Sequence, residues 1–395
     1  SLVADQPTAA NEKDYARALE RANNFRAASD EYHAALADGD GADNTVRTSY
    51  ERMHLRTTPE LEGGGAFRSD PQAWAWRAQA GAALPFGAHH QAGLLAWHDA
   101  STDWNANQVV GPNVLRETGS ITGLGGYAMF GRRSGASLLV GADARYASTT
   151  GDDAAGVELY GPRNGFGFGG QGELDAPVSK IMQVNLHLDL NEQWNDAPVT
   201  IHEGGTMTGA TGHLYLFPQS RVVLVDSGAQ ARRLSLSPLE AGDATPTADQ
   251  LLLWAGIDFN LWSDAKEIVR GESLDERMVR GRPLNDAGVI AYRHYENFAD
   301  LSPNFRISLF PRDSIDSGTL ILRKAFAAGR AGVELRGGAG YDNQQDEVIG
   351  QAGGTIVVAA SWSTRLTINY DWIHQSTTGI PGTLQIGWVA FHADL

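Results

Sequence analysis

The feature that most constrains the fold is a two-residue alternation of apolar and polar side chains, which begins near Pro59 and recurs to the end of the chain. In MQVNLHLDLNEQW the valine and the leucines occupy every second position, and polar residues fill the positions between them. The stretches SLLVGADARYAS and TRLTINYDW repeat the pattern. Because successive side chains of a strand point to opposite faces, the pattern predicts strands with one apolar and one polar face.

Soluble β-sandwiches also alternate in this way, so a second observation is needed to choose between them and a membrane barrel. The apolar face carries aromatic residues toward the strand ends, as expected for the aromatic girdles of outer-membrane barrels. The polar face mixes both charge signs with many glycines, which suits a water-filled lumen. We therefore expect a mainly β fold, a transmembrane antiparallel barrel. The aromatic residues are Trp74, Trp76, Tyr146, Phe166, Phe168, Trp262, Tyr341, Tyr370 and Trp372.

Turn signals divide residues 59–395 into candidate strands whose number is even, as in single-chain bacterial barrels. Short and long connections alternate between them. Short turns belong on the periplasmic side, so both the N-terminal region and the C-terminus are expected in the periplasm. The stretch 299–316 is predicted as an outer loop, although NFRISLFP within it could form a further strand. The sixteen predicted strands are 59–69, 73–84, 91–100, 118–131, 136–148, 157–174, 181–194, 207–217, 220–235, 250–262, 287–298, 317–326, 330–342, 348–360, 364–375 and 383–395.

The first 58 residues have a different texture and form a separate predicted domain, 1–58, before the barrel domain, 59–395. Apolar residues in EKDYARALERANNFRAASDEYHAALADGDG recur at helical spacing, and glycines end the run. The pair of helices resembles the end of a tetratricopeptide array, whose units bury their faces by stacking. A capping helical hairpin without a neighbour is the alternative.

Composition excludes several classes of function. The chain has no cysteine, so it has no disulfide, thiolate metal site or cysteine nucleophile. A net charge of −16 argues against nucleic-acid binding. No apolar run approaches the roughly 18 residues of a membrane-spanning helix. Motifs of serine hydrolases, zinc proteases, phosphate-binding loops and calcium loops are missing, so we predict no catalytic residue, metal or cofactor.

The inward polar face of the predicted barrel carries carboxylates and arginines in similar numbers. These side chains are candidates for the path of a polymer, and two tryptophans on the same face are candidates for stacking on sugar rings. The alternative is that the charged pairs only brace the wall. The lumen candidates are Asp143, Glu173, Asp189, Asp226, Asp258, Glu334, Asp371, Trp254 and Trp388.

The predicted outer loops carry many acids and few bases. An acidic mouth would attract a cationic solute or polymer. Divalent-cation bridging to lipopolysaccharide and plain solubility are the competing explanations. The residues predicted for this mouth are Asp152, Asp153, Asp196, Glu203, Asp243, Asp313 and Asp316.

The stretch SDAKEIVRGESLDERMVRGRPLND, residues 263–286, is charged and lacks alternation, although predicted strands precede and follow it. Strand parity places it among the short periplasmic turns. Its acids and bases nearly cancel, which suits a segment that folds into a mixed-charge lumen or docks on a partner. We interpret it as a periplasmic plug or docking loop, with a disordered turn as the alternative. Its charged candidates are Asp264, Glu267, Arg270, Glu272, Asp275, Glu276, Arg277, Arg280 and Arg282.

The stretches LLLWAGIDFNLWSDA, GVIAYRHYENF, SGTLILRKAF and AGVELRGGAGYDN resemble the barrel of PelB-like proteins, which secrete the Pel exopolysaccharide across the outer membrane. The resemblance covers about 59–395, and 11–56 resembles the end of the preceding repeats. It implies export of a cationic, partly deacetylated amino-sugar polymer for the biofilm matrix. It also implies contacts with outer-membrane lipids and lipopolysaccharide, a periplasmic lipoprotein ring at the barrel rim, and a periplasmic polymer-modifying enzyme.

Other functions remain open at this level. The same plan serves exporters of cellulose and poly-N-acetylglucosamine, and a diffusion porin would share the barrel. A barrel enzyme would need a Ser–His constellation, and no convincing pair stands out in the sequence.

Overall fold

The computed structural model describes residues 8–22, 24–38, 46, 49–50, 53, 57–69, 73–86, 90–103, 116–131, 136–152, 158–193, 206–218, 220–235, 247–263, 284–298, 313–327, 330–344, 346–360, 364–376 and 381–394.

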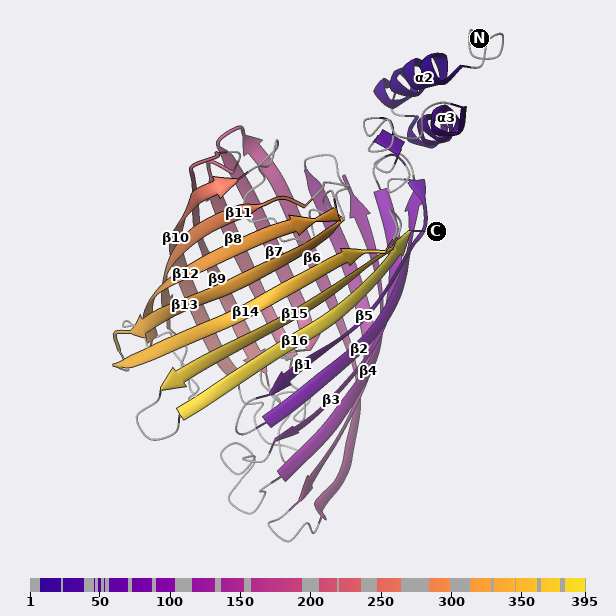
Figure 1. The fold of residues 1–395 in the computed structure, drawn as a ribbon. Coiled ribbons are helices and arrows are strands. Elements are labelled where there is room, and N and C mark those ends of the chain that lie inside the picture. Colours follow the sequence, from indigo (N-terminus) through magenta and orange to yellow (C-terminus); the bar gives the residue numbers. More distant parts are fainter. Residues whose placement is uncertain are drawn as a thin grey trace.

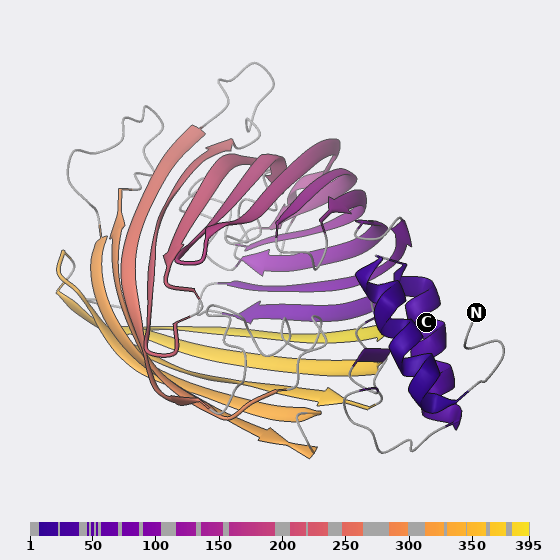
Figure 2. The same ribbon diagram turned by 90° about the horizontal axis from the view of Figure 1, so that it is seen from above.

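Sixteen antiparallel strands form one closed barrel in which each strand pairs with its neighbours in sequence and β1 pairs with β16 (Figures 1 and 2). The expected fold class and strand number are therefore confirmed. The strands are β1 (Glu60–Ser69), β2 (Ala73–Phe86), β3 (His90–Asp103), β4 (Arg116–Phe130), β5 (Ser137–Asp152), β6 (Glu158–Ser179), β7 (Met182–Gln193), β8 (Thr206–Leu216), β9 (Val223–Ser235), β10 (Thr247–Ser263), β11 (Ala287–Asn297), β12 (Asp313–Phe326), β13 (Ala331–Asp342), β14 (Glu347–Ala359), β15 (Thr364–Ser376) and β16 (Pro381–Asp394).

The barrel has two different ends. We call the end at which β1 begins and β16 ends the helix end, and the opposite one the loop end. The connections of the loop end include 104–115, 194–205, 236–246 and 298–312. Those of the helix end are short, with one exception: the connection from β10 to β11, which spans 264–286. The order of the strands therefore places this segment at the same end of the barrel as the short turns, as the sequence predicts.

The two faces of the wall differ in the way expected of a transmembrane barrel. On β13, the side chain of Leu335 is 58% exposed, whereas Glu334 beside it is only 5% exposed. Since the less exposed face of a closed barrel is its interior, the polar face points inward and the apolar face outward. An outward apolar face is stable against lipid and unstable against water.

Most exposed aromatic side chains lie toward the two ends of the outer surface, with aliphatic side chains between them, whereas Phe168 and Tyr292 lie near the middle of their strands. Two such girdles at the membrane interfaces are the expected arrangement for a barrel in a bilayer. Toward the loop end the girdle contains Phe67, Trp76, Tyr146, Phe166, Tyr341, Tyr370 and Trp372, and toward the helix end it contains Phe86, Phe130, Phe217, Phe259, Trp262, Phe326 and Phe391.

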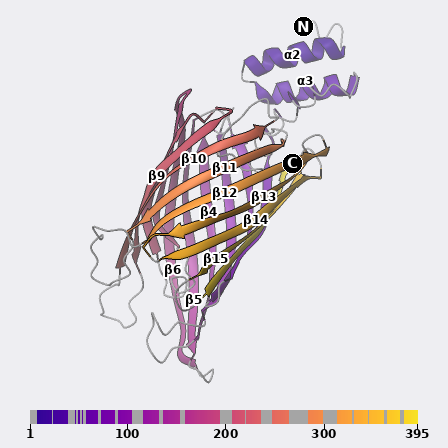
Figure 3. The same ribbon diagram turned by 60° about the vertical axis from the view of Figure 1, so that its left-hand side comes forward.

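The helices α2 (Ala9–Arg21) and α3 (Phe25–Asp38) precede the barrel. They lie beyond the helix end of the barrel, as two views agree (Figures 1 and 3). Thr8 begins α2 as an N-cap, because its side-chain oxygen accepts a hydrogen bond from the Asn11 backbone N–H at 3.4 Å. The helices pack through a small core that includes Ala16, Ala28 and Tyr32. No helix among the described residues has the length and hydropathy needed to cross a membrane.

The loop end differs from the prediction because the strands there are longer than expected. Asp152 lies in β5, and Asp313 and Asp316 lie in β12, although all three were predicted in outer loops. The sequence pattern ends where the apolar band ends, because both faces of a strand are polar beyond it. The backbone hydrogen bonds of the ladder continue past that point. The rest of the predicted loop 299–316 lies outside the described residues.

The other predicted residues at the two mouths also lie outside the described residues. At the loop end these are Asp153, Asp196, Glu203 and Asp243. In the connection from β10 to β11 they are Asp264, Glu267, Arg270, Glu272, Asp275, Glu276, Arg277, Arg280 and Arg282.

Candidate functional site

The candidate site is the interior wall of the barrel. The structure places all nine sequence-predicted lumen residues on the interior face, because each occupies the strand parity of the buried polar side chains. It does not bring them together as one site. Five belong to two separate clusters on adjacent ranges of strands: Asp226, Trp254 and Asp258 on β8–β11, and Glu334 and Asp371 on β12–β15. The residues on the interior face are Asp143, Glu173, Asp189, Asp226, Trp254, Asp258, Glu334, Asp371 and Trp388.

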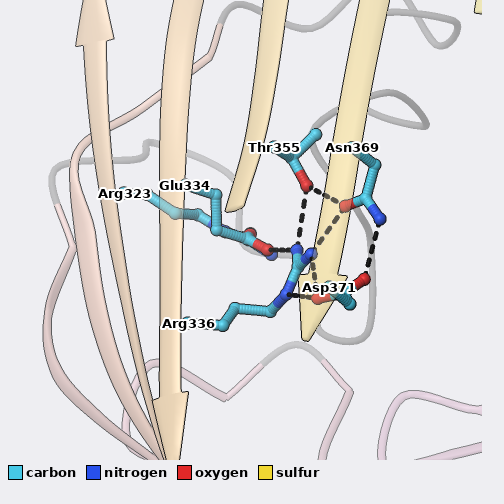
Figure 4. A network of polar contacts seen from close by, with 6 residues as sticks. All are labelled: Arg323, Glu334, Arg336, Thr355, Asn369 and Asp371. Atoms are coloured by element: carbon cyan, nitrogen blue, oxygen red, sulfur yellow. Dashed lines mark hydrogen bonds and ion pairs between the residues drawn. The ribbon is translucent and has the colours of Figure 1, made fainter. Parts of the chain in front are cut away.

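The first cluster, here called the arginine cluster, crosses four strands and centres on Arg336 (Figure 4). The Arg336 guanidinium donates to Asp371 Oδ1 at 2.8 Å and to Asn369 Oδ1 at 2.6 Å. It also donates to Glu334, which accepts a second hydrogen bond from Arg323. The full cluster is Arg323, Glu334, Arg336, Thr355, Asn369 and Asp371.

The charges of the arginine cluster cancel, because two guanidiniums face two carboxylates. Charge-assisted hydrogen bonds of this kind are strong, and they hold neighbouring strands in a fixed relation. Glu334 and Asp371 were predicted for a polymer path, yet their carboxylates are occupied by arginine. Bracing the wall, the alternative that the sequence left open, fits this part of the lumen best.

The second cluster, here called the aromatic cluster, lies on β8–β11. Its rings are His213 and Tyr215, which stack with centroids 5.5 Å apart and planes 13° apart, and Trp254, whose centroid lies 4.6 Å from that of His213. Its charged side chains are Asp226, Asp258 and Arg293. The full cluster is His213, Tyr215, Asp226, Trp254, Asp258 and Arg293.

The electrostatics of the aromatic cluster differ from those of the arginine cluster. Arg293 Nη1 donates to Asp258 Oδ1 at 2.5 Å. Its Nε lies 3.6 Å from Asp226 Oδ2. The other neighbours of Asp226 are also distant, with Trp254 Nε1 at 3.4 Å and His213 Nδ1 at 3.5 Å. With His213 neutral, two carboxylates share one guanidinium, and the cluster carries a net negative charge.

The other three acids predicted for the lumen have closer polar partners. Asp143 Oδ1 accepts from Arg145 at 3.0 Å, and Glu173 Oε1 accepts from the Asn185 amide at 2.9 Å. Asp189 Oδ1 lies 2.6 Å from His187 Nε2. Glu173 and Asp189 are therefore paired with an amide and an imidazole and not with a guanidinium. Their carboxylates leave negative charge on the interior face of β6 and β7.

Sequence reasoning missed three members of the aromatic cluster and one further ion pair. His213 and Tyr215 alternate with leucines in GHLYLF, so their inward direction was readable from the strand period. Arg293 follows the same rule on β11. Their proximity was not readable, because it depends on register across four strands. The missed pair is Arg77 with Asp99, joined by two hydrogen bonds of 2.6 and 2.9 Å.

The two described acids of the predicted mouth on β12 point to opposite faces. Asp313 faces the interior and accepts from the Asn297 amide at 3.0 Å. Asp316 faces outward, where it accepts from Asn343 at 3.0 Å and lies 3.0 Å from His294 Nδ1. These two carboxylates therefore do not line a common opening.

The fold is shared with known outer-membrane barrels. A solved structure of a bacterial polysaccharide outer membrane secretin is similar to this chain with a TM-score of 0.52 and 10% identity, over 86% of this chain and 99% of that one. The CymD monoaromatic hydrocarbon channel gives a TM-score of 0.46 and 8% identity, over 88% and 91%. OccK7 of Pseudomonas aeruginosa gives 0.36 and 10%, over 86% and 98%. No protein-family model matches the sequence, and no curated protein matches it.

Proposed function

We propose that this protein is an outer-membrane channel that exports a cationic, partly deacetylated amino-sugar polysaccharide of the Pel type to the biofilm matrix. The observation that carries the proposal is the aromatic cluster, which combines stacked rings with a net negative charge on the inner wall of a closed barrel. Carbohydrates pack their C–H faces on aromatic rings, and an ammonium group seeks a carboxylate. The barrel fold that the chain shares with a polysaccharide secretin agrees with a conduit.

The proposed orientation puts the helix end in the periplasm. It is supported by the length of the connections, because outer-membrane barrels have short periplasmic turns and long outer loops. The helices α2 and α3 then lie where a periplasmic lipoprotein ring and a polymer-modifying enzyme would meet the channel. Those two partners, and lipopolysaccharide around the loop end, are part of the proposal.

The connection 264–286 is proposed to act as a plug or docking loop at the periplasmic mouth. Support comes from the end of the connection next to β11, where Leu284 lies on the inner face of the wall. Leu284 is buried against Val357 of β14 and Ala325 of β12. Asp286 accepts hydrogen bonds from the Lys324 ammonium and from the Ala325 backbone N–H. This end of the connection is thereby attached to the wall, with Leu284 on the inner face and Asp286 beside the outward-facing Lys324.

Release of sugars from proteoliposomes tests the proposed function. Liposomes containing the full chain, or a variant lacking 264–283 so that a closed pore does not mask passage, are loaded with labelled hexamers of glucosamine or of N-acetylglucosamine. Through the variant, we expect the glucosamine hexamer to be released faster than the N-acetylglucosamine hexamer. Release no faster than from protein-free liposomes would contradict export. Equal release of both hexamers would favour a diffusion porin.

A further inference from the structure

We propose that the aromatic cluster on β8–β11 is a subsite for one amino-sugar ring, with the pyranose face against Tyr215 and His213 and the ammonium group on Asp226. The inference rests on the proposed function, since it identifies where the lumen would contact such a polymer. It goes further by assigning the recognition of the amine to one carboxylate.

The platform of the subsite is formed by the two stacked rings. His213 and Tyr215 are two residues apart on β8, so they point to the same interior face. Their planes are nearly parallel, at 13°, and both side chains are partly exposed, His213 at 30%. The Tyr215 hydroxyl also lies 3.3 Å from His213 Nδ1. Two parallel, partly exposed rings offer aromatic surface to a ligand in the lumen.

Trp254 supports this platform and does not itself offer a stacking face. It is only 9% exposed and lies over Gly228, where a Cβ would come within 2.2 Å of the indole ring. Its ring centroid is 4.6 Å from that of His213. The sequence-based expectation that Trp254 stacks on sugars is therefore replaced: Trp254 positions His213, and the exposed rings are those of β8.

Asp226 is the carboxylate that a cationic ligand would satisfy. Its oxygens have three neighbours at 3.4 to 3.6 Å, all longer than the 2.5 Å hydrogen bond between Arg293 and Asp258. Arg293 is therefore committed mainly to Asp258. An ammonium group beside Asp226 would neutralise the excess charge of the cluster, whereas an N-acetyl group would bring no charge.

The arginine cluster provides the internal comparison. Asp371 lies on the interior face of β15 and is also a carboxylate of the lumen, but Arg336 donates to it at 2.8 Å. General attraction of cations to an acidic lumen would depend on Asp371 and Asp226 alike. A subsite at the aromatic cluster would depend on Asp226 alone.

Calorimetric titration of the purified full chain in detergent tests the subsite, with the glucosamine hexamer and the N-acetylglucosamine hexamer as probes. We expect the wild type to bind the glucosamine hexamer, and Asp226→Asn to weaken binding about tenfold or more, as for loss of a charge-assisted hydrogen bond. Tyr215→Ala should weaken it as well, and Tyr215→Phe should retain it. Asp371→Asn is the matched control and should bind as the wild type does. Heat-modifiable migration on gels verifies that each variant forms the barrel.

Three results would overturn the subsite: no binding by the wild type, equal binding of the N-acetylated hexamer, or equal losses in Asp226→Asn and Asp371→Asn. Each is separable from failure of the proposed function, which is read from hexamer release. If hexamer release is as proposed but Asp226→Asn binds the glucosamine hexamer as the wild type does, the subsite is contradicted and the proposed channel is not.

Discussion

Arg336 on β13 and Asp371 on β15 are hydrogen-bonded across the strand that separates them. Two nitrogens of the guanidinium reach the same carboxylate oxygen, Nη2 at 2.8 Å and Nε at 3.3 Å. The intervening strand, β14, contributes Thr355, which accepts from Arg336 Nη1 at 2.9 Å. The side chain thus ties three neighbouring strands together on the inner face, independently of their backbone ladder.

Replacing this arginine should weaken the barrel. Arg336→Met removes one of the two arginine donors of Glu334 and leaves Asp371 without its guanidinium partner, so we expect a loss of about 2–3 kcal/mol in the free energy of unfolding. Urea unfolding in lipid vesicles measures it. Arg233→Met is the matched control, because Arg233 pairs with Asp249 while being 64% exposed, and solvent-exposed pairs contribute little to stability. Equal effects of the two substitutions would contradict the bracing role.

A charged side chain should destabilise the barrel on its outer surface and be tolerated on its inner surface. Leu188 lies outward in the middle of β7 and is 53% exposed. Leu188→Arg should cost roughly 2–4 kcal/mol of folding free energy in a bilayer. Gln171→Arg, on the interior face of the neighbouring strand, should cost much less. Folding yield and unfolding free energy in vesicles compare them, and an equal penalty would argue against lipid contact at Leu188.

The rim contact of Asp286 should depend on pH. Hydrogen bonds from Lys324 and from the Ala325 backbone N–H lower the pKa of Asp286 below its ordinary 3.8. A carboxylate with a lowered pKa stabilises the folded contact above its ordinary pKa, and that stabilisation is lost as the pH falls through the folded value. Acidification below pH 3.8 should therefore release this contact.

Hydrogen exchange at the Ala325 backbone N–H, relative to its intrinsic rate at each pH, follows that release. Asp286→Asn lacks the titrating group, so its protection should not change over the same pH range. Protection in the wild type that stays constant through acidification would contradict the assignment.

Deleting 264–283 should open the pore if this connection plugs the helix end. In planar bilayers we expect low conductance for the wild type and a severalfold increase for the deletion. A deletion of 238–245, which shortens a connection at the loop end, is the control and should leave conductance near the wild-type value. Unchanged conductance after the first deletion would exclude a plug and favour a docking role.

Much of the wall could be predicted from the sequence, and the reason is local. The strand period assigns Asp226 and Trp254 to one face and Leu253 to the other, because the direction of a side chain in a strand depends only on parity. The same rule was enough to count the strands and to place the long connection at the helix end. It failed for Asp313 and Asp316, because alternation disappears beyond the apolar band while the hydrogen-bonded ladder continues.

The sequence by itself determined the number of strands, the identity of the inward face and the apolar outer band, since each follows from side chains at fixed spacing along one strand. Only the tertiary structure decided which interior charges meet. Asp371 finds Arg336 two strands away, and Asp226 finds Trp254 and His213 from neighbouring strands. Those contacts depend on the register of each pair of neighbouring strands, and no single stretch of sequence encodes that register. Register therefore separates the carboxylate that braces the wall from the carboxylate that we propose binds an amino sugar.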